Sequence, residues 1–413
     1  MGLDLRPALT ALLASLTVAG AASAAPPPVG DLRLERVVML YRHGVRAPLK
    51  GEAAEALADQ PWPVWSTPES YLTPHGREGM RLLGAYDRMR LVRDGLLPAT
   101  GCPKSGQVEI WTNSVERTIK SGEALAEGLA PGCALAIGHR PMGENDPLFS
   151  PLEAKAVPYD AQAAVAAFNQ ETGGAAHLAA PYGEAIHTVE AVLGCRQPGR
   201  PAPCDLAADP AAVRVSADGQ GADLSGAIAT TSGTAEVFLM EYIEGLPLDQ
   251  VGWGRASRAR LSEMSRLHGL LFDVYVRSSY MAPRSAGPMG RRIEAALVAK
   301  DGPALTLLVG HDDNIAAVAA LLGVHVHIDS YGYDDPPVGG GIGFEVLKDK
   351  AGQRYVRVFY QAQTLDQLRA LTPLTLGQPP ARQTLRVDAC ALDGSDVCPL
   401  AAFQALLDRR LTL

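Results

Sequence analysis

One unit occurs three times along this chain: a short apolar segment, a cluster of polar residues, and then a helical pattern. The apolar segments are Leu34–Leu40, Val108–Thr112 and Leu305–Val309, and each has the length and composition of a buried strand. Strands that alternate with helices form an α/β fold, in which helices flank a mainly parallel sheet. Such sheets gather their chemistry at the carboxyl ends of the strands, where all three polar clusters fall. The recurring unit therefore predicts a three-layer α/β domain with a site at one edge of its sheet.

The first polar cluster is the heptapeptide Arg-His-Gly-Val-Arg-Ala-Pro at positions 42–48. The guanidiniums of Arg42 and Arg46 can fork onto phosphate oxygens, and His43 between them is a nitrogen nucleophile that can accept a phosphoryl group. The five fixed positions of Arg-His-Gly-x-Arg-x-Pro arise by chance in a chain of this length with a probability of roughly 10⁻⁴. The motif predicts a site for a phosphoryl group, and the alternative is a basic surface turn.

The other two clusters add candidate ligands for an anion. Asn113 and Ser114, predicted as an N-cap, precede a helix that carries Arg117 in its first turn. His311 and Asp312 precede the apolar stripe of another helix, and helix N-termini favour anions. Two alternatives stay open: Arg117 paired with a neighbouring glutamate on a solvated face, and Asp312 acting only as a helix cap.

Together these motifs resemble the histidine acid phosphatases, the branch of the histidine phosphatase superfamily that includes periplasmic phytases and glucose-1-phosphatases. The resemblance is carried by residues 42–48, 113–118, 245–253 and 310–314, and it runs nearly end to end. It implies a secreted acid phosphatase that hydrolyses phosphomonoesters through a covalent phosphohistidine intermediate. No cofactor or metal is implied.

The resemblance also implies a role for each site residue. His43 is the expected nucleophile, and Arg42, Arg46, Arg117 and His311 are the expected phosphate ligands. Asp312, which follows the second histidine, is the expected proton donor to the leaving alkoxide. Its neighbour Asp313 departs from the family pattern, since many members carry a small hydroxyl residue there, and it competes with Asp312 for the proton role.

Residues 1–24 have the pattern of a signal peptide: Arg6, a mostly apolar stretch, and the cleavage sequence Ala-Ser-Ala. A transmembrane anchor is the alternative. The remaining length favours two domains. We expect a discontinuous α/β phosphatase domain over 31–146 and 289–413, and a smaller, mostly helical inserted domain over 147–288. Late in the chain, Gly343–Leu347 and Tyr355–Tyr360 predict an antiparallel hairpin at a sheet edge, and Pro336–Gly341 is predicted to be a simple turn.

Six cysteines outside the leader suggest disulfides and a periplasmic or secreted protein. Fifteen pairings are possible from sequence alone, and the family resemblance suggests sequential pairing. Zinc is disfavoured because the chain has no Cys-x-x-Cys or His-x-x-x-His spacing. The net charge of −8 without a basic run disfavours nucleic acid, and no membrane partner is expected after signal cleavage. The expected partner is a small phosphorylated substrate, and the oligomeric state stays open.

Substrate choice depends on weaker signals. Leu49 stands where many phytase-like members place a hydroxyl residue, and Glu244 near the pocket mouth is expected to repel additional phosphates. Lys50 has the opposite effect. Glu236 is a further candidate for lining the pocket. These residues favour a sugar phosphate such as glucose 1-phosphate slightly over phytate. The alternatives are a strict phytase and a non-catalytic periplasmic protein that binds polyanions.

Overall fold

The computed structural model describes residues 32–198 and 204–413, so the predicted signal peptide lies outside the described residues. An eight-stranded sheet forms the centre of the fold. Its strands are β1 (Arg33–Arg42), β2 (Val108–Thr112), β3 (Ile137–Gly138), β6 (Leu305–Gly310), β7 (Gly341–Lys348), β8 (Arg354–Ala362), β9 (Ala381–Leu385) and β10 (Val397–Pro399). Their order is β10-β8-β7-β1-β6-β2-β3, and β9 also pairs with β8.

The three apolar segments predicted as strands are β1, β6 and β2, and they lie side by side. β6 is parallel to both of its neighbours, and β3 continues the parallel half of the sheet. In register, Arg42 lies opposite Gly310, and Thr112 lies opposite Val309. The carboxyl ends of the three strands therefore meet at one edge, as the recurring unit predicts. The α/β class is confirmed, with a sheet that is mixed because β7 joins β1 in the antiparallel sense.

The predicted hairpin exists as β7 and β8, but its predicted place at the sheet edge is wrong. β7 pairs with the central strand β1, and the outer side of β8 is covered by β9 and β10. All residues of β7 except the last are buried. A strand buried on both faces has the same apolar pattern at the centre of a sheet as at a covered edge, so the sequence could not place this one.

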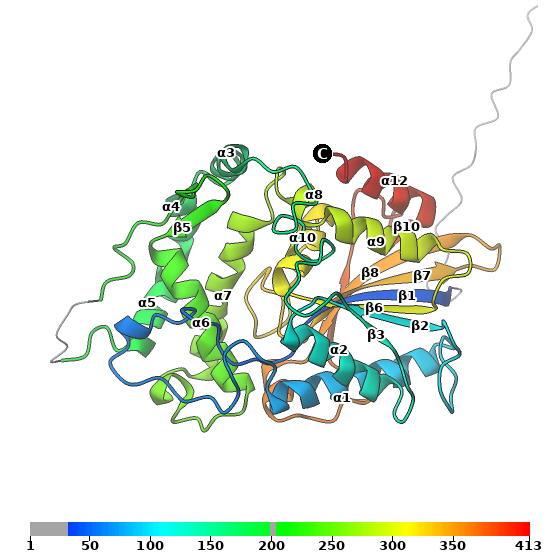
Figure 1. The fold of residues 1–413 in the computed structure, drawn as a ribbon, viewed down its shortest axis with the longest axis horizontal. Helices are drawn as coiled ribbons and strands as arrows, with labels where there is room; N and C mark the ends of the chain where they lie inside the picture. The colour runs from blue at the N-terminus through cyan, green and yellow to red at the C-terminus, as the bar shows by residue number, and fades with distance from the viewer. Residues whose placement is uncertain (1–31, 199–203) are drawn as a thin grey trace, which may run out of the picture.

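Helices cover both faces of the sheet (Figure 1). On one face lie α1 (Pro74–Arg93), which Thr73 caps, and α2 (Glu116–Leu129). On the other lie α9 (Gly287–Val298), α10 (Asp312–Leu322) and α12 (Leu400–Arg410). The side chains of β1 alternate between these layers: Met39 joins the core beneath α1 and α2, whereas Leu40 joins the core with α10.

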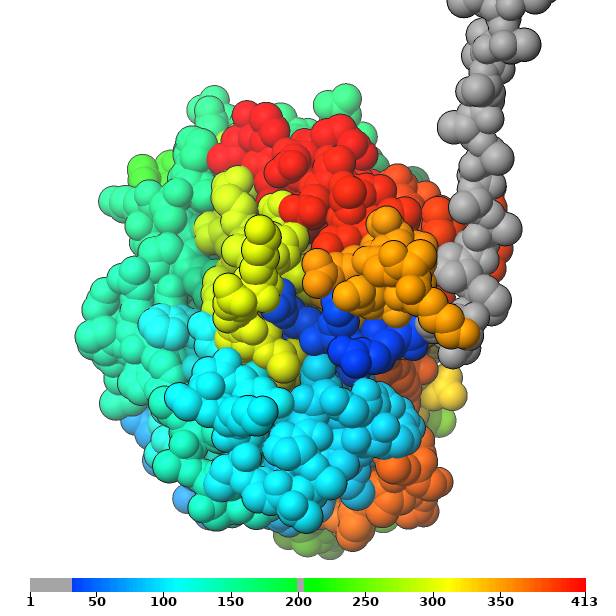
Figure 2. Space-filling view, turned by 90° about the vertical axis from the view of Figure 1, so that its right-hand side faces the viewer, coloured from blue at the N-terminus to red at the C-terminus, as the bar shows by residue number. Residues whose placement is uncertain are grey.

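Residues 147–288 lie beside the carboxyl ends of the strands (Figure 1). Their helices are α3 (Ala161–Thr172), α4 (Ala175–Ala179), α5 (Gly183–Leu193), α6 (Ala227–Ile243), α7 (Arg258–Tyr275) and α8 (Ala282–Ser285). A separate hairpin is formed by β4 (Ala212–Val215) and β5 (Ala222–Ser225). Apolar residues of α6 and α7 belong to the same core as one face of the sheet. The division into two domains stays a prediction. Figure 2 shows the opposite end of the molecule, where the start of β1, the β7–β8 turn and the C-terminal helix reach the surface.

Three disulfides join the cysteines in sequential order: Cys102–Cys133, Cys195–Cys204 and Cys390–Cys398. The suggested pairing is therefore confirmed. None of the helices in the described part of the chain has the length and apolar composition needed to cross a membrane.

Candidate active site

His43 lies directly after β1, at the edge where the three parallel strands end. Its Nδ1 is 2.8 Å from the carbonyl oxygen of Gly44. A carbonyl can only accept a hydrogen bond, so Nδ1 carries the proton and Nε2 keeps its lone pair. Burial, and then the positive charge of Arg117, hold the pKa of His43 well below its usual value. The ring is therefore neutral in acid, with one nitrogen available to attack.

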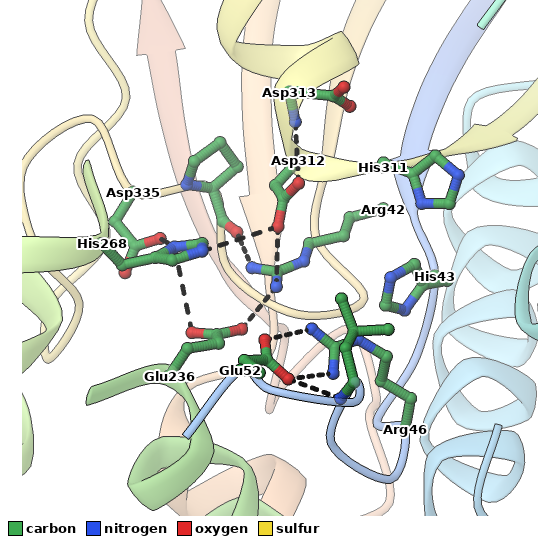
Figure 3. A network of polar contacts seen from close by, with 12 residues as sticks. Arg42, His43, Arg46, Glu52, Glu236, His268, His311, Asp312, Asp313 and Asp335 are labelled. Carbon is green, nitrogen blue, oxygen red and sulfur yellow. Dashed lines mark hydrogen bonds and ion pairs between the residues drawn. The ribbon is translucent and has the colours of Figure 1, made fainter. Parts of the chain in front are cut away.

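His311 stands at the end of β6 and faces His43, with 5.4 Å between the ring centroids (Figure 3). The side-chain amide of Asn113, at the end of β2, donates to Nε2 of His311 over 2.8 Å. Burial and the charge of Arg117 lower the pKa of His311 to about 3. A neutral His311 with its Nε2 occupied carries its proton on Nδ1, where it can act as a hydrogen-bond donor.

Arg117 lies in the first turn of α2 and lines the same cavity as the two histidines. Within the described residues it forms no ion pair. The glutamates that could have paired with it are occupied: Glu116 accepts the backbone N–H of Leu72, and Glu123 pairs with Lys120. Burial, and then repulsion from Arg46, lower the pKa of Arg117 to about 10. An unpaired guanidinium beside other cations is suited to bind an anion.

The two arginines of the heptapeptide are held by carboxylates. Arg46 forms a forked pair with Glu52, at 2.6 and 2.7 Å. Arg42 is almost fully buried; its guanidinium bonds Glu236 and lies 2.8 Å from Asp312. Glu236, predicted to lie at the pocket, therefore stands behind Arg42 and acts on the site through it.

A buried charge network extends from Arg42 to α7 (Figure 3). Nδ1 of His268 is 2.8 Å from Asp335, and His268 also lies 3.9 Å from both Glu236 and Asp312. Burial alone would lower the pKa of His268, but Glu236 and Asp335 outweigh it and raise that pKa to about 9. One ligand atom each from Glu236, His268 and Asp335 lie within 4.8 Å of one another, the spacing of a metal site. Arg42 and the imidazolium supply the positive charge there, so we assign the cluster to charge pairing.

The two adjacent aspartates have different environments. Burial raises the pKa of Asp312, but the positive charges of Arg42 and His268 outweigh burial and hold that pKa below its usual value. Asp313 points away from this network, toward the cavity (Figure 3). Asp313 is exposed on the cavity wall, and loss of water around it, followed by the negative charge of Asp312, raises its pKa to about 7. In the free protein Asp312 is ionised, and Asp313 holds a proton in acid.

These groups open onto a cavity of about 1160 Å³. His43, Arg46, Arg117, His311 and Asp312 line one end, so the structure brings together the residues that three separate motifs predicted. Leu49 and Lys50 also line the cavity.

Some predictions for individual residues were wrong. Val115, not Asn113 or Ser114, is the N-cap of α2, because Asn113 binds His311 and Ser114 donates to the carbonyl of Glu144. Glu244 does not stand at the pocket mouth: it accepts the hydroxyl of Thr73 at the start of α1.

The stretch predicted as a simple turn holds the heptapeptide in place. The carbonyl of Pro336 accepts the guanidinium of Arg42 over 2.7 Å, and the N–H of Gly339 donates to the carbonyl of His43 over 2.9 Å. Sequence reasoning also missed Glu52, His268 and Asp335. Asp335 directly precedes that turn, but nothing in the local pattern marked a partner 67 residues away on α7.

Residues 33–179 match the family model of the histidine phosphatase superfamily (branch 2). The chain is 33% identical over 421 residues to a phytase of Escherichia coli (strain K12), with 96% of each covered. It is 30% identical to a glucose-1-phosphatase of Salmonella typhimurium, with 96% of this chain and 97% of that one covered. Its structure is similar to the Hafnia alvei phytase in complex with tartrate, with a TM-score of 0.86, 33% identity, and 94% and 98% of the two chains covered. The chain belongs to the histidine phosphatase superfamily, branch 2.

Proposed function

We propose that this protein hydrolyses phosphomonoesters through a phosphohistidine formed on Nε2 of His43. The observation that carries the proposal is the hydrogen bond from Nδ1 of His43 to the Gly44 carbonyl, which leaves Nε2 free in a cavity lined by Arg46, Arg117 and His311. Nε2 attacks phosphorus, the P–N bond forms, and the P–O bond to the alcohol breaks. Water then breaks the P–N bond and releases inorganic phosphate.

The charge on the transferring phosphoryl group is met by fixed donors. Arg117 has no carboxylate partner among the described residues, so it binds the phosphoryl oxygens without first breaking an ion pair. Nδ1–H of His311 and the guanidinium of Arg46 act beside it, in a buried site where such donors act strongly. Glu236 acts as a positioning residue, because its contact is with Arg42.

For the proton donor we propose Asp312. A phosphate dianion bound near Arg42 partly offsets the positive charge that keeps Asp312 ionised. The pKa of Asp312 therefore rises as the substrate binds. Asp313 is the second candidate, because its pKa of about 7 leaves it protonated in acid. With a neutral His43 and a protonated carboxyl, we expect turnover to be greatest at roughly pH 4–6.

The relatives named above are phytases and a glucose-1-phosphatase, which makes phytate and sugar phosphates the reference substrates for this chain. The predicted leader and the three disulfides support an exported, periplasmic or secreted enzyme. The substrate is a small phosphorylated molecule.

Rapid-quench trapping tests the covalent step. The purified mature protein, mixed with a radiolabelled phosphomonoester, is expected to yield a protein-bound phosphate that is acid-labile and stable to base. His43→Ala is expected to abolish the trapped species and to lower turnover by a factor of at least about 10⁴. Trapping with the same stability in that variant would assign the nucleophile elsewhere.

Two further measurements accompany the trapping. Chelators are expected to leave turnover unchanged, since the arginines and His311 supply the charge stabilisation. A protein that binds phosphate tightly but yields neither turnover nor trapped phosphate would be the non-catalytic binding protein.

A further inference from the structure

Apolar side chains line part of the cavity that holds the phosphate site. We call this region the apolar arm, and define it by Val165 and Phe168 of α3, Val213 of β4, and Leu271, Phe272 and Val274 of α7. We propose that the apolar arm receives the alcohol part of the substrate, and that the preferred substrates are phosphomonoesters of hydrophobic alcohols. This inference rests on the proposed function, because the arm opens onto the same phosphate site.

The arm begins at the charge network and runs along α7. His268, Leu271, Phe272 and Tyr275 all line the cavity, and they follow one another at the spacing of a single helix face. His268 at one end lies 3.9 Å from Asp312. From His268 to Tyr275 the helix rises about 10 Å, so the apolar wall extends that far from the proton donor. An alkyl, acyl or aromatic group attached to the phosphate oxygen lies along this wall.

Further apolar side chains of the arm come from α3 and from β4, whose hairpin contacts α3. Val165 is partly buried, and Phe168 and Val213 are buried beside it. The arm therefore takes its apolar side chains from α3, β4 and α7 rather than from a single helix.

Charged groups are scarce in this part of the cavity. Apart from the site residues already described, the charged side chains on its wall are Lys50, Glu153 and Lys155. Two lysines opposed by a glutamate provide little positive charge for the further phosphates of phytate. The polar side chains of Tyr159, Gln220, Tyr275 and Ser285 also line the cavity, but a sugar hydroxyl placed against the valine and phenylalanine side chains of the arm would lose water without gaining a hydrogen-bond partner. A hydrophobic alcohol loses nothing comparable.

The test is a chain-length series on the purified mature protein. We measure kcat/KM by phosphate release for ethyl, butyl, hexyl and octyl phosphate, together with phenethyl phosphate, glucose 1-phosphate and phytate. The alkoxides of the series have similar basicity, so the chemical step stays nearly constant and the comparison reports the arm. We expect kcat/KM to rise about threefold per added methylene group until the arm is full. Phenethyl phosphate distinguishes an aromatic from an aliphatic preference.

A flat series, or phytate or glucose 1-phosphate preferred over octyl phosphate, would overturn the inference while leaving the proposed function intact. Absence of turnover on every ester, with no phosphate trapped on His43, would instead refute the proposed function.

A pair of variants on α3 locates the effect. Val165→Asp places a carboxylate on the arm wall and is expected to reduce the octyl-to-ethyl ratio of kcat/KM at least about tenfold. Ala166→Asp is the matched control, because Ala166 is the next residue of the same helix, is exposed, and is not on the wall; its ratio is expected to stay unchanged. Equal octyl-to-ethyl ratios in the two variants would show that the alkyl group of the substrate does not lie against Val165. If Val165→Asp does not fold, the series on the unmodified protein still decides.

Discussion

Two clusters, each with three arginines, lie in different parts of this molecule, and their charges are balanced in opposite ways. On β7, the buried carboxylate of Glu345 accepts hydrogen bonds from Arg90, Arg357 and Arg382 at 2.8–2.9 Å. Burial would raise the pKa of Glu345, but Arg382 and the other two arginines lower it to about 2. Every contact in this cluster joins opposite charges, and the cluster does not line the cavity.

The second cluster contains Arg42, Arg46 and Arg117. The first two have carboxylate partners, whereas Arg117 has none within the described residues, and the two histidines beside it are held neutral. The comparison teaches that buried charge alone does not mark a site. A site for an anion is marked by clustered positive charge, part of which has no carboxylate partner.

The largest expected effect concerns Asp312, which we propose as the proton donor and which lies against Arg42 of the second cluster. Asp312→Asn is expected to lower turnover of a sugar or alkyl phosphate by a factor of about 10² to 10⁴, and that of a nitrophenyl ester much less, because nitrophenolate leaves without a proton. Asp313→Asn is expected to do little on either. If the two variants exchanged behaviour, the donor would be Asp313. An equal loss on both esters for Asp312→Asn would show that this residue positions the site.

Removing the unmatched charge should affect catalysis alone. Arg117→Ala is expected to lower kcat/KM by a factor of about 10² to 10³, because a donor to the transferring phosphoryl group is lost. The free energy of unfolding should stay the same or rise, since repulsion from Arg46 is relieved. Lys120→Ala, one turn along α2 and exposed, is the control and should change neither quantity. A large loss of stability in Arg117→Ala would mean that Arg117 is a structural residue.

In the cluster around Glu345, a substitution should change stability and leave catalysis unchanged. Glu345→Gln is expected to lower the free energy of unfolding by about 3 kcal/mol at neutral pH and to leave kcat/KM per folded molecule unchanged. The folded state lowers the pKa of Glu345 from 4.5 to about 2, so its contribution is present above pH 4.5 and is lost as the pH falls toward 2. Urea unfolding at several pH values measures this. Glu109→Gln, which breaks the more exposed pair with Arg292, is the control.

Glu241 of α6 sharpens the comparison, because it is a buried carboxyl that forms no ion pair within residues 32–198 and 204–413. Burial raises its pKa to about 8, and the N–H of Gly252 opposes this only in part. Between pH 4.5 and 8 the folded protein holds a proton that the unfolded chain releases, so stability falls as the pH rises. Glu241→Gln should be more stable than the parent by roughly 1–3 kcal/mol at pH 8 and equal to it near pH 4. Parallel stability curves for the two proteins would contradict this.

The sequence predicted those parts of the site that depend on local pattern. The apolar segments preceding His43, Asn113 and His311 are strands, and because they are parallel neighbours, the polar residues after them converge. The start of α1 likewise depends on residues close together in the chain, since Thr73 caps it and Pro74 is its first residue.

What the sequence could not predict depends on distant contacts. The pairing of His268 with Asp335 joins α7 to a loop before β7, and no periodicity relates them. Asn113 has the composition of a helix cap, but tertiary contact with His311 overrides that propensity. The inward position of β7 also depends on strands that come later in the chain, β9 and β10, which cover its partner β8.

The neighbours of β1 have a consequence for when this enzyme can become active. Residues 33–42 are among the first described residues to be synthesised, yet their strand pairs only with β6 and β7, which begin at Leu305 and Gly341. The guanidinium of Arg42 and the backbone of His43 bind Pro336 and Gly339, also from the last quarter of the chain. Contacts of such long sequence separation slow folding, and none of them can form before residues 305–341 have been synthesised. A nascent chain therefore carries His43 without the strands and loop that surround it, and the site can form only when synthesis has passed residue 341.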